Sequence, residues 1–315
     1  MAQPTNAFDT YDAIGIREDL QDVIYSIAPT ETPFMSAAAR EQIKNTLHEW
    51  QTDSLASAAT NNAVIEGDEA TLDAVSATTR LSNSSQIMDK TVVITGTQEA
   101  VDKAGRASEI AYQIAKKSKE LKRDIEATLL TNQARVAGNS STARKFGSIG
   151  AWIATNDNLA SDGSSPTASD GSDARNDGTQ RALTEDMLKE VIKGTWNSGG
   201  NPSVIMVGPF NKQKISGFTG NSTRFDASED KTLYTSIDVY SSDFGDLEVV
   251  PNRFSRERDA LVLDMDYWAV GFLRDFTMHE LSKTGDSEKR QLLAELTMIS
   301  RNEGASGGVF DLTTS

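Results

Sequence analysis

The sequence contains no cysteine and only two histidines. The lack of cysteine excludes a disulfide framework and any metal site built from thiolates. His48 and His279 lie far apart in the chain, and each falls in a segment that alternates like a β-strand. We therefore interpret both histidines as ordinary strand residues rather than as catalytic groups.

Long apolar runs and net positive charge are also absent. No stretch approaches the ~20 apolar residues that a membrane-spanning helix needs, so we expect no membrane contact. The formal net charge is −15, which argues against bulk affinity for nucleic acid. Residues 1–15 have neither a basic region nor an apolar core, so we expect no signal peptide and a protein that works in a cytoplasm.

Sequence motifs of enzymes are missing as well. The chain has no GxGxxG between a strand and a helix, and no GxxxxGK[ST], GxSxG or HExxH. Asp264 and Asp266 follow a predicted buried strand, a place where acid–base or metal-binding carboxylates occur. One pair of carboxylates without partners is a weak signal, so a cytoplasmic α/β enzyme is a minor hypothesis. We expect no cofactor and no bound metal.

The strongest positive feature is a helical pattern from residue 97 to about residue 134. Its apolar positions recur at spacings of three and four, which places them on one face: Ala107, Ala111, Ile114, Leu121, Ile125 and Leu129. A continuous helix here would be roughly 50–55 Å long, about the diameter of a compact globule of this chain length. This predicts a flat subunit built around one strut. Gly105 leaves open a kink or a later start near Ser108.

The polar side of this helix carries a basic cluster formed by Lys116, Lys117, Lys119, Lys122 and Arg123. One interpretation is the solvated face of a long helix. The other is a positive side of an otherwise acidic subunit that faces phosphate groups, since phosphate contact requires no sequence code.

The segments before the helix carry too few apolar residues to form a core of their own. Residues 1–45 resemble an arm, with an amphipathic pattern at Ile16, Leu20, Val23, Ile24 and Ile27 and a second short helix that begins at Thr32–Pro33. Residues 46–95 read as strands around a long polar tip, which predicts an extended hairpin that leaves the globule. Such a hairpin needs a neighbour to cover it.

The segments after the helix predict an α+β chain. An α/β unit is expected over 183–264, with helices that start at Thr184 and Pro209 and strands at 203–207, 247–250 and 260–263. The loop 156–180 contains five aspartates, but their spacing fits neither the EF-hand nor the glycine-rich nonapeptide pattern, which favours a flexible surface loop. Strands at 272–282 and 290–300 are expected to form a hairpin, and the second of these runs also fits a helical period.

This order of elements resembles the major capsid protein of tailed bacteriophages, with the Hong Kong 97-type fold. The resemblance is carried by element order along nearly the whole chain and by four short motifs. These are similar to one phage capsid family: DAIGIREDL at 12–20, APTETPF at 28–34, VDKAGR at 101–106 and ELKRDIE at 120–126.

The resemblance implies a role for each segment. It implies an N-terminal arm (1–45), an extended loop over a neighbouring subunit (46–95), a peripheral domain with a spine helix (96–150), an axial α/β domain (151–264), and closing strands of the peripheral domain with the C-terminal tail (265–315). Within the extended loop, the residues expected to meet a neighbour are Trp50, Leu55, Ile65, Leu72, Arg80 and Leu81.

The implied function is structural. Such a chain self-assembles as pentamers and hexamers into an icosahedral shell around double-stranded DNA, has no catalytic site, and belongs to the virion after assembly in the host cytoplasm. Its expected partners are copies of itself, packaged DNA through non-specific contact, and portal, scaffolding and decoration proteins. The alternative with the same fold is the shell subunit of a cellular nanocompartment.

Overall fold

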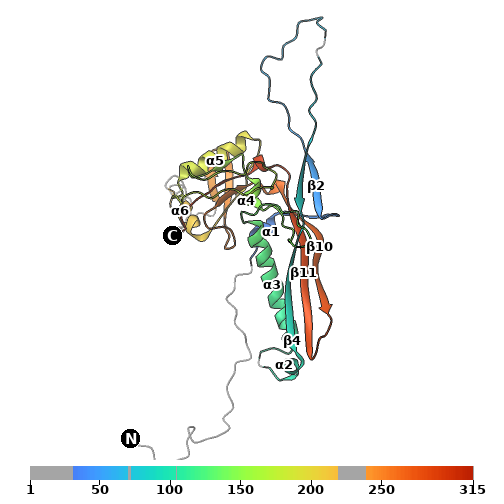
Figure 1. Ribbon diagram of the computed structural model, residues 1–315. Coiled ribbons are helices and arrows are strands. Elements are labelled where there is room, and N and C mark those ends of the chain that lie inside the picture. Colours follow the sequence, from blue (N-terminus) through green and yellow to red (C-terminus); the bar gives the residue numbers. More distant parts are fainter. Residues whose placement is uncertain (1–30, 70–71, 104, 219–238, 315) are drawn as a thin grey trace, which may run out of the picture.

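The computed structural model describes residues 31–69, 72–103, 105–218 and 239–314. It has a tall part, in which a helix lies along a long sheet, a rounded α/β part beside it, and a hairpin that projects beyond both (Figure 1). The amphipathic pattern over 16–27 lies outside the described residues.

The tall part is a four-stranded sheet with one helix on its face. The strands lie in the order β1 (Ala39–Gln42), β10 (Trp268–Leu281), β11 (Ser287–Ser300) and β4 (Gln86–Thr95), with β1 parallel to β10 and the other pairs antiparallel. Helix α3 (Glu109–Leu129) covers this sheet, and Leu121, Ile125 and Leu129 are buried in one core with Phe272 and Leu296. The helix therefore packs against the hairpin formed by β10 and β11.

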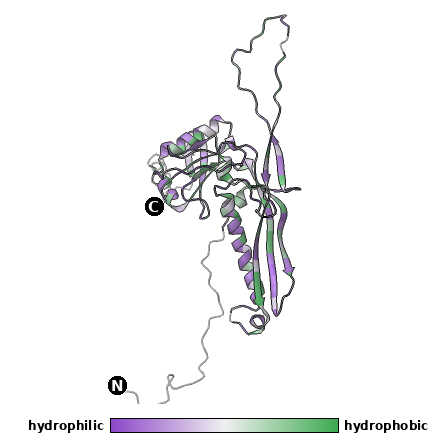
Figure 2. Cartoon of the chain, in the orientation of Figure 1, coloured by the Kyte–Doolittle hydropathy of each residue, from purple (hydrophilic) through white to green (hydrophobic). Residues whose placement is uncertain are grey.

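Hydropathy divides α3 lengthwise. Hydrophilic residues run down its outward side, whereas hydrophobic residues colour the strand beside it (Figure 2). An apolar stripe against the sheet therefore positions the helix, as its three- and four-residue spacing predicted.

The predicted single helix from 97 to 134 is wrong in its length. The structure has a short α2 (Gly96–Ala100), a loop, and then α3 with Ser108 as its N-cap, whose hydroxyl accepts a hydrogen bond from the Ala111 backbone N–H. Gly105 has a φ of 76°, a left-handed conformation that a right-handed helix cannot contain. The alternative of a start near Ser108 is confirmed. At 1.5 Å per residue α3 is roughly 32 Å long, which is shorter than the predicted 50–55 Å. The length of the tall part is therefore provided by the strands of the sheet together with the helix.

The projecting hairpin consists of β2 (Leu47–Thr52) and β3 (Thr79–Ser84), which pair antiparallel. We expected the hairpin to include residues up to 95, and this boundary is wrong because β4 pairs with β11 throughout its length. Alternate β4 residues, including Met88 and Val92, turn toward α3 and are covered there, which holds β4 in the body of the subunit.

The α/β part confirms the predicted unit. Its six-stranded sheet has the order β5 (Asp157–Asn158), β12 (Gly307–Val309), β9 (Ala260–Leu263), β6 (Val204–Val207), β8 (Gly245–Pro251) and β7 (Val239–Ser242). Helices α5 (Glu185–Asn197) and α6 (Pro209–Ser216) begin at the predicted Thr184 cap and at Pro209.

The C-terminal tail lies in the α/β part, not in the tall part where we expected it. Strand β12 lies between β9 and β5, and Phe310 and Leu312 are fully buried beyond it. A Cβ at Gly307 would collide with the Asn156 carbonyl oxygen, and one at Gly308 with the Phe310 ring. Two glycines therefore let the tail fit closely into this sheet.

Two short helices join these parts. Helix α1 (Pro33–Ala37), predicted from Thr32–Pro33, packs Phe34 into the main core, and α4 (Ile149–Trp152) lies fully buried beside it. Among the described residues, no helix combines the length and the apolar character that a membrane span would require.

Candidate assembly interface

The base of the projecting hairpin is fixed to its own subunit. The Trp50 indole N–H donates a hydrogen bond of 2.9 Å to the Ser300 carbonyl oxygen, and its ring centroid lies 5.5 Å from that of Trp152. Leu81 is partly buried against the same core, whereas Arg80 forms an exposed ion pair with Glu49. Trp50 and Leu81 therefore anchor the hairpin inside the subunit.

Buried polar groups at the end of β3 and just after it strengthen this anchor. The Asn83 amide donates to the Met298 carbonyl oxygen at 2.7 Å, and its own carbonyl oxygen accepts from the Gly147 N–H. The Ser85 hydroxyl donates to Glu295 at 2.7 Å, and the same carboxylate pairs with Arg144 and Arg274. Burial opposes the charge of Glu295, but these partners outweigh it and hold the pKa of Glu295 below its ordinary value.

The tip of the hairpin, residues 53–78, has a different character. Leu55 is 99% exposed and Leu72 is 98% exposed, and Val64, Ile65 and Val75 are also largely exposed. Among the described residues of this tip, every hydrogen bond joins two residues of the hairpin itself. Exposed apolar side chains on a segment without support from the body mark a binding surface.

Charge adds to the character of this tip. It contains Asp53, Glu66, Asp68, Glu69 and Asp73, and no lysine or arginine. A rigid base therefore presents an apolar and acidic loop well beyond the body of the subunit (Figure 1). Such a loop suits a partner surface that is apolar and carries positive charge.

The basic cluster on α3 does not point in one direction. Lys116 and Lys119 are exposed, and Arg123, at a spacing of seven from Lys116, lies on the same side of the helix. Lys117 forms a 2.7 Å ion pair with Glu120, and Lys122 lies over the ring of Phe276. The Arg123 guanidinium, however, is half-buried and lies over the ring of Phe254. Lys116 and Lys119 thus form the positive face of α3.

The residues of the enzyme hypothesis have structural roles. Asp264 is buried, accepts the Asp266 backbone N–H as a cap, and also accepts the Asn201 N–H at 3.1 Å. His48 stacks on Trp50, and burial lowers its pKa, whereas His279 lies 3.2 Å from the Thr277 hydroxyl on the surface. In the described part of the chain, no three His, Asp or Glu residues converge as metal ligands would.

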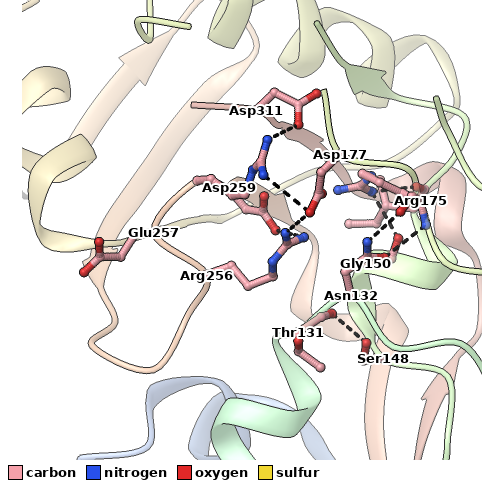
Figure 3. Close-up of polar contacts among 12 residues, drawn as sticks. Thr131, Asn132, Ser148, Gly150, Arg175, Asp177, Arg256, Glu257, Asp259 and Asp311 are labelled. Atoms are coloured by element: carbon pink, nitrogen blue, oxygen red, sulfur yellow. Dashed lines mark hydrogen bonds and ion pairs between the residues drawn. The ribbon is translucent and has the colours of Figure 1, made fainter. Parts of the chain in front are cut away.

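An ion-pair network joins the loop after α4 to the α/β sheet, which the sequence analysis did not find (Figure 3). Asp177 pairs with Arg256 at 2.5 Å, and Arg258 pairs with the fully buried Asp311 at 2.8 Å. The Arg175 guanidinium is buried and donates to two backbone carbonyl oxygens, those of Gly150 and Ile153. The loop we expected to be a flexible excursion is therefore held by specific contacts. The apolar pattern gave no signal of them, because the partners are far apart in sequence.

Glu126 is a second group that sequence reasoning missed. It is fully buried on α3 and accepts the backbone N–H groups of Phe34 at 2.7 Å and Met35 at 2.9 Å. It also accepts the Asn252 side-chain amide at 2.7 Å. Burial raises the pKa of Glu126, against the effect of these three donors. One carboxylate thus ties α1, α3 and the α/β part together. The sequence does offer one indication of this role, because Glu126 directly follows Ile125, a residue of the apolar face of the helix.

Solved structures of phage capsids share this fold. The cyanophage A-1(L) capsid asymmetric unit matches with a TM-score of 0.66 and 13% identity, over 98% of this chain and 99% of that chain. The Gordonia phage Cozz structure matches with a TM-score of 0.64 and 11% identity, over 99% of this chain and 98% of that chain. The structure of phage G gp27 major capsid proteins and gp26 decoration proteins matches at 0.56 and 10% identity, over 99% and 100%. The chain therefore has the Hong Kong 97-type fold of these phage capsid structures.

The family follows from sequence. The family model described as SU10 major capsid protein matches residues 3–313, so the chain belongs to this family and is a major capsid protein of a tailed bacteriophage. The major capsid protein of Escherichia phage Phieco32 is 28% identical over 346 aligned residues, which cover 98% of both chains. The phage capsid prediction is confirmed, against the alternatives of a nanocompartment shell and an α/β enzyme. The chain is a component of the virion and assembles with itself.

Proposed function

We propose that this chain closes an icosahedral shell of pentamers and hexamers around double-stranded DNA, and that the hairpin tip (residues 53–78) clamps a neighbouring subunit. In this proposal the tall part is the peripheral domain with α3 as its spine, and the α/β part is the axial domain. Assembly takes place in the host cytoplasm, with portal, scaffolding and decoration proteins as partners. The subunit has no catalytic activity.

The exposed apolar side chains of the tip carry this proposal. Burying one leucine side chain is worth about 1.5–3 kcal/mol, and Leu55 and Leu72 are almost completely exposed in the single subunit. Their burial against a neighbour adds to assembly without adding to the stability of the isolated chain. The rigid base, held by Trp50 and Asn83, gives the tip a fixed direction.

The test is a double substitution, Leu55→Ser with Leu72→Ser. The matched control is Ala56→Ser with Ala74→Ser, which changes exposed small residues of the same tip. We expect the leucine variant to unfold at the same denaturant concentration as the wild type but to give few shells by electron microscopy, whereas the control assembles normally. Normal shell yield from the leucine variant would refute the clamp.

We also propose that the positive face of α3 turns toward packaged DNA. Lys116 and Lys119 are exposed on a subunit of net charge −15, and their contact with phosphate needs no base recognition. The alternative is that these lysines are simply the solvent-exposed face of the helix and bind nothing.

The variant Lys116→Glu with Lys119→Glu separates these interpretations. We expect intact shells that retain less DNA, with a larger loss at low salt, where charges are least screened. The matched control is Lys189→Glu with Lys193→Glu on α5, which makes the same change of charge elsewhere. Equal DNA retention in the two variants would favour the solvated face.

A further inference from the structure

The long sheet of the tall part has one edge that no other described element covers. Its order is β1, β10, β11 and β4, so β1 and β4 are the outer strands. Strand β4 lies beside α3 (Figure 1), and a 2.5 Å ion pair between Lys90 and Asp124 joins the two. Strand β1 ends opposite Phe272, whereas β10 continues to Leu281. The second half of β10 is therefore an outer strand itself.

This half of β10, residues 273–281, is the open edge of the sheet. In the described part of the chain, the last backbone hydrogen bond on the side away from β11 is the one that the Ile43 N–H donates to the Phe272 carbonyl oxygen, at 3.0 Å. At about 3.4 Å per residue, the open edge is roughly 30 Å long. Unpaired N–H and C=O groups over this length are a template for a further strand.

The charges of the open edge do not oppose such a strand. Many proteins keep an outer strand from pairing by placing unpaired charged side chains on it. Here each acidic or basic side chain of the open edge has an opposite charge beside it in the same subunit: Arg274 with Glu295 at 2.8 Å, Glu280 with Arg290 at 2.6 Å, and Asp275 with Arg40. Two copies of this edge therefore meet without unpaired like charges between them.

The side chains around Thr277 form a pattern that complements itself when it is reversed. Phe276 and Met278 flank Thr277, line a groove against α3, and are only partly buried and 53% exposed, respectively. Thr277 is exposed on the other face, where its hydroxyl lies 3.2 Å from His279. An antiparallel copy centred on Thr277 places Phe276 of each strand opposite Met278 of the other, and threonine opposite threonine. Both kinds of cross-strand pair are favourable.

We propose that the open edge of β10 pairs with the same edge of a second copy of this chain, antiparallel and about a two-fold axis at Thr277. The pairing joins two four-stranded sheets into one and covers the exposed side of Phe276 and Met278. Each subunit offers the same strand, so the contact is self-complementary and closed. It rests on the self-assembly of this capsid family and not on the proposed clamp, because the open edge lies far from the hairpin tip (Figure 1).

A single cysteine tests this pairing, because a residue on a two-fold axis lies opposite its own copy and the natural chain has no cysteine. In Thr277→Cys the two Cα atoms are expected about 4.5–5.5 Å apart, within the span of a disulfide. Mild oxidation of purified shells should therefore give a covalent dimer, joined at residue 277 in both chains by mass spectrometry.

Two exposed positions serve as controls for this disulfide. His279 lies on the same face as Thr277, but the proposed register separates the two copies of residue 279 by about 14 Å. Thr91 is exposed on β4, the other outer strand. We expect Thr277→Cys to form dimers many-fold faster than His279→Cys and Thr91→Cys. A rate no higher than that of either control would overturn the proposal.

Charge at the axis gives a second test without a crosslink. Thr277→Lys places two lysines opposite each other and Thr277→Glu two carboxylates, and like charges directly opposite are destabilising. We expect each variant alone to unfold like the wild type, because Thr277 is exposed, but to give several-fold fewer shells by electron microscopy. Co-expression of the two should restore the yield, since lysine then meets glutamate. Normal yield from each variant alone, or no recovery on co-expression, would overturn the proposal, and neither result depends on the hairpin tip.

Discussion

Single buried charged residues connect parts of this subunit that are far apart in sequence. Glu126 receives three hydrogen bonds from two other parts of the chain and has no cation among them. Asp311 has a φ of 60°, pairs with Arg258, and accepts the Ala160 and Gly178 N–H groups. Removing one partner of such a group leaves donors buried without acceptors, which is costly.

Glu126→Ala should therefore lower the free energy of unfolding of the unassembled subunit by about 3 kcal/mol or more, since buried unpaired donors cost about 1–3 kcal/mol each. Chemical denaturation measures this. Glu120→Ala is the control, because Glu120 on the same helix forms a partly exposed ion pair with Lys117, and its loss should cost less than about 1 kcal/mol. Equal losses would contradict the linking role of Glu126.

Asp259 makes stability depend on pH. It is almost fully buried, and burial raises the pKa of Asp259 to about 6 from the ordinary 3.8, although Arg256 and Arg175 oppose this. The folded state then binds its proton more tightly than the unfolded state, so this contribution to stability falls as pH rises from about 4 to about 6. At 1.36 kcal/mol per pKa unit, the full effect is about 3 kcal/mol.

The variant Asp259→Asn has no such titration. Relative to the wild type, it should gain up to about 3 kcal/mol in free energy of unfolding between pH 4 and pH 7. Denaturation of both proteins at the two pH values gives this difference directly. A difference that stays constant with pH would show that Asp259 keeps an ordinary pKa in the folded subunit.

At the scale of elements, α3 is the part on which the tall sheet depends. Leu121 and Ile125 are at most 1% exposed and share a core with Phe272 and Leu296. Either Leu121→Ala or Ile125→Ala should cost about 2–5 kcal/mol of subunit stability. The control Ala127→Ser lies on the exposed side of α3 and should stay within about 0.5 kcal/mol in the same unfolding assay.

Elements with a clear period could be predicted from sequence, whereas their pairing could not. The α5 cap at Thr184, the short strand at 204–207 and the hairpin of β10 and β11 follow from local patterns. The assignment of β4 to the tall sheet depends on β11, which lies about two hundred residues further along the chain. A local pattern describes a half-buried strand but does not name the partner that buries it.

In the candidate interface, too, the contacts that the sequence did not predict are those between segments far apart in the chain. Exposed leucines in a polar loop are visible in the sequence, and Leu55, Ile65 and Leu72 are indeed exposed. Nothing in the sequence indicated that Trp50 and Leu81 differ from these exposed residues. In the structure both lie in the hairpin base, where Trp50 donates a hydrogen bond to the Ser300 carbonyl oxygen and its ring packs near that of Trp152. Ion pairs such as Asp177 with Arg256 join distant loops and leave no periodic signal.

At the scale of the whole molecule, the subunit combines a well-packed body with a hairpin tip whose apolar side chains it does not bury itself. The body has two sheets and one main core that extends from α3 to the α/β part. The hairpin tip exposes apolar side chains, and the family to which the chain belongs forms phage capsids. Under the proposed role of the tip, assembly is the step that buries these side chains.

Cleavage of the tip by a glutamate-specific protease tests this claim most directly. Glu66 and Glu69 lie in the exposed tip, which has no lysine or arginine for trypsin. We predict rapid cleavage after these residues in unassembled subunits and strong protection in purified shells, where a neighbour covers the tip. A tip that is already resistant in single subunits, or that is cut equally fast in shells, would contradict the account.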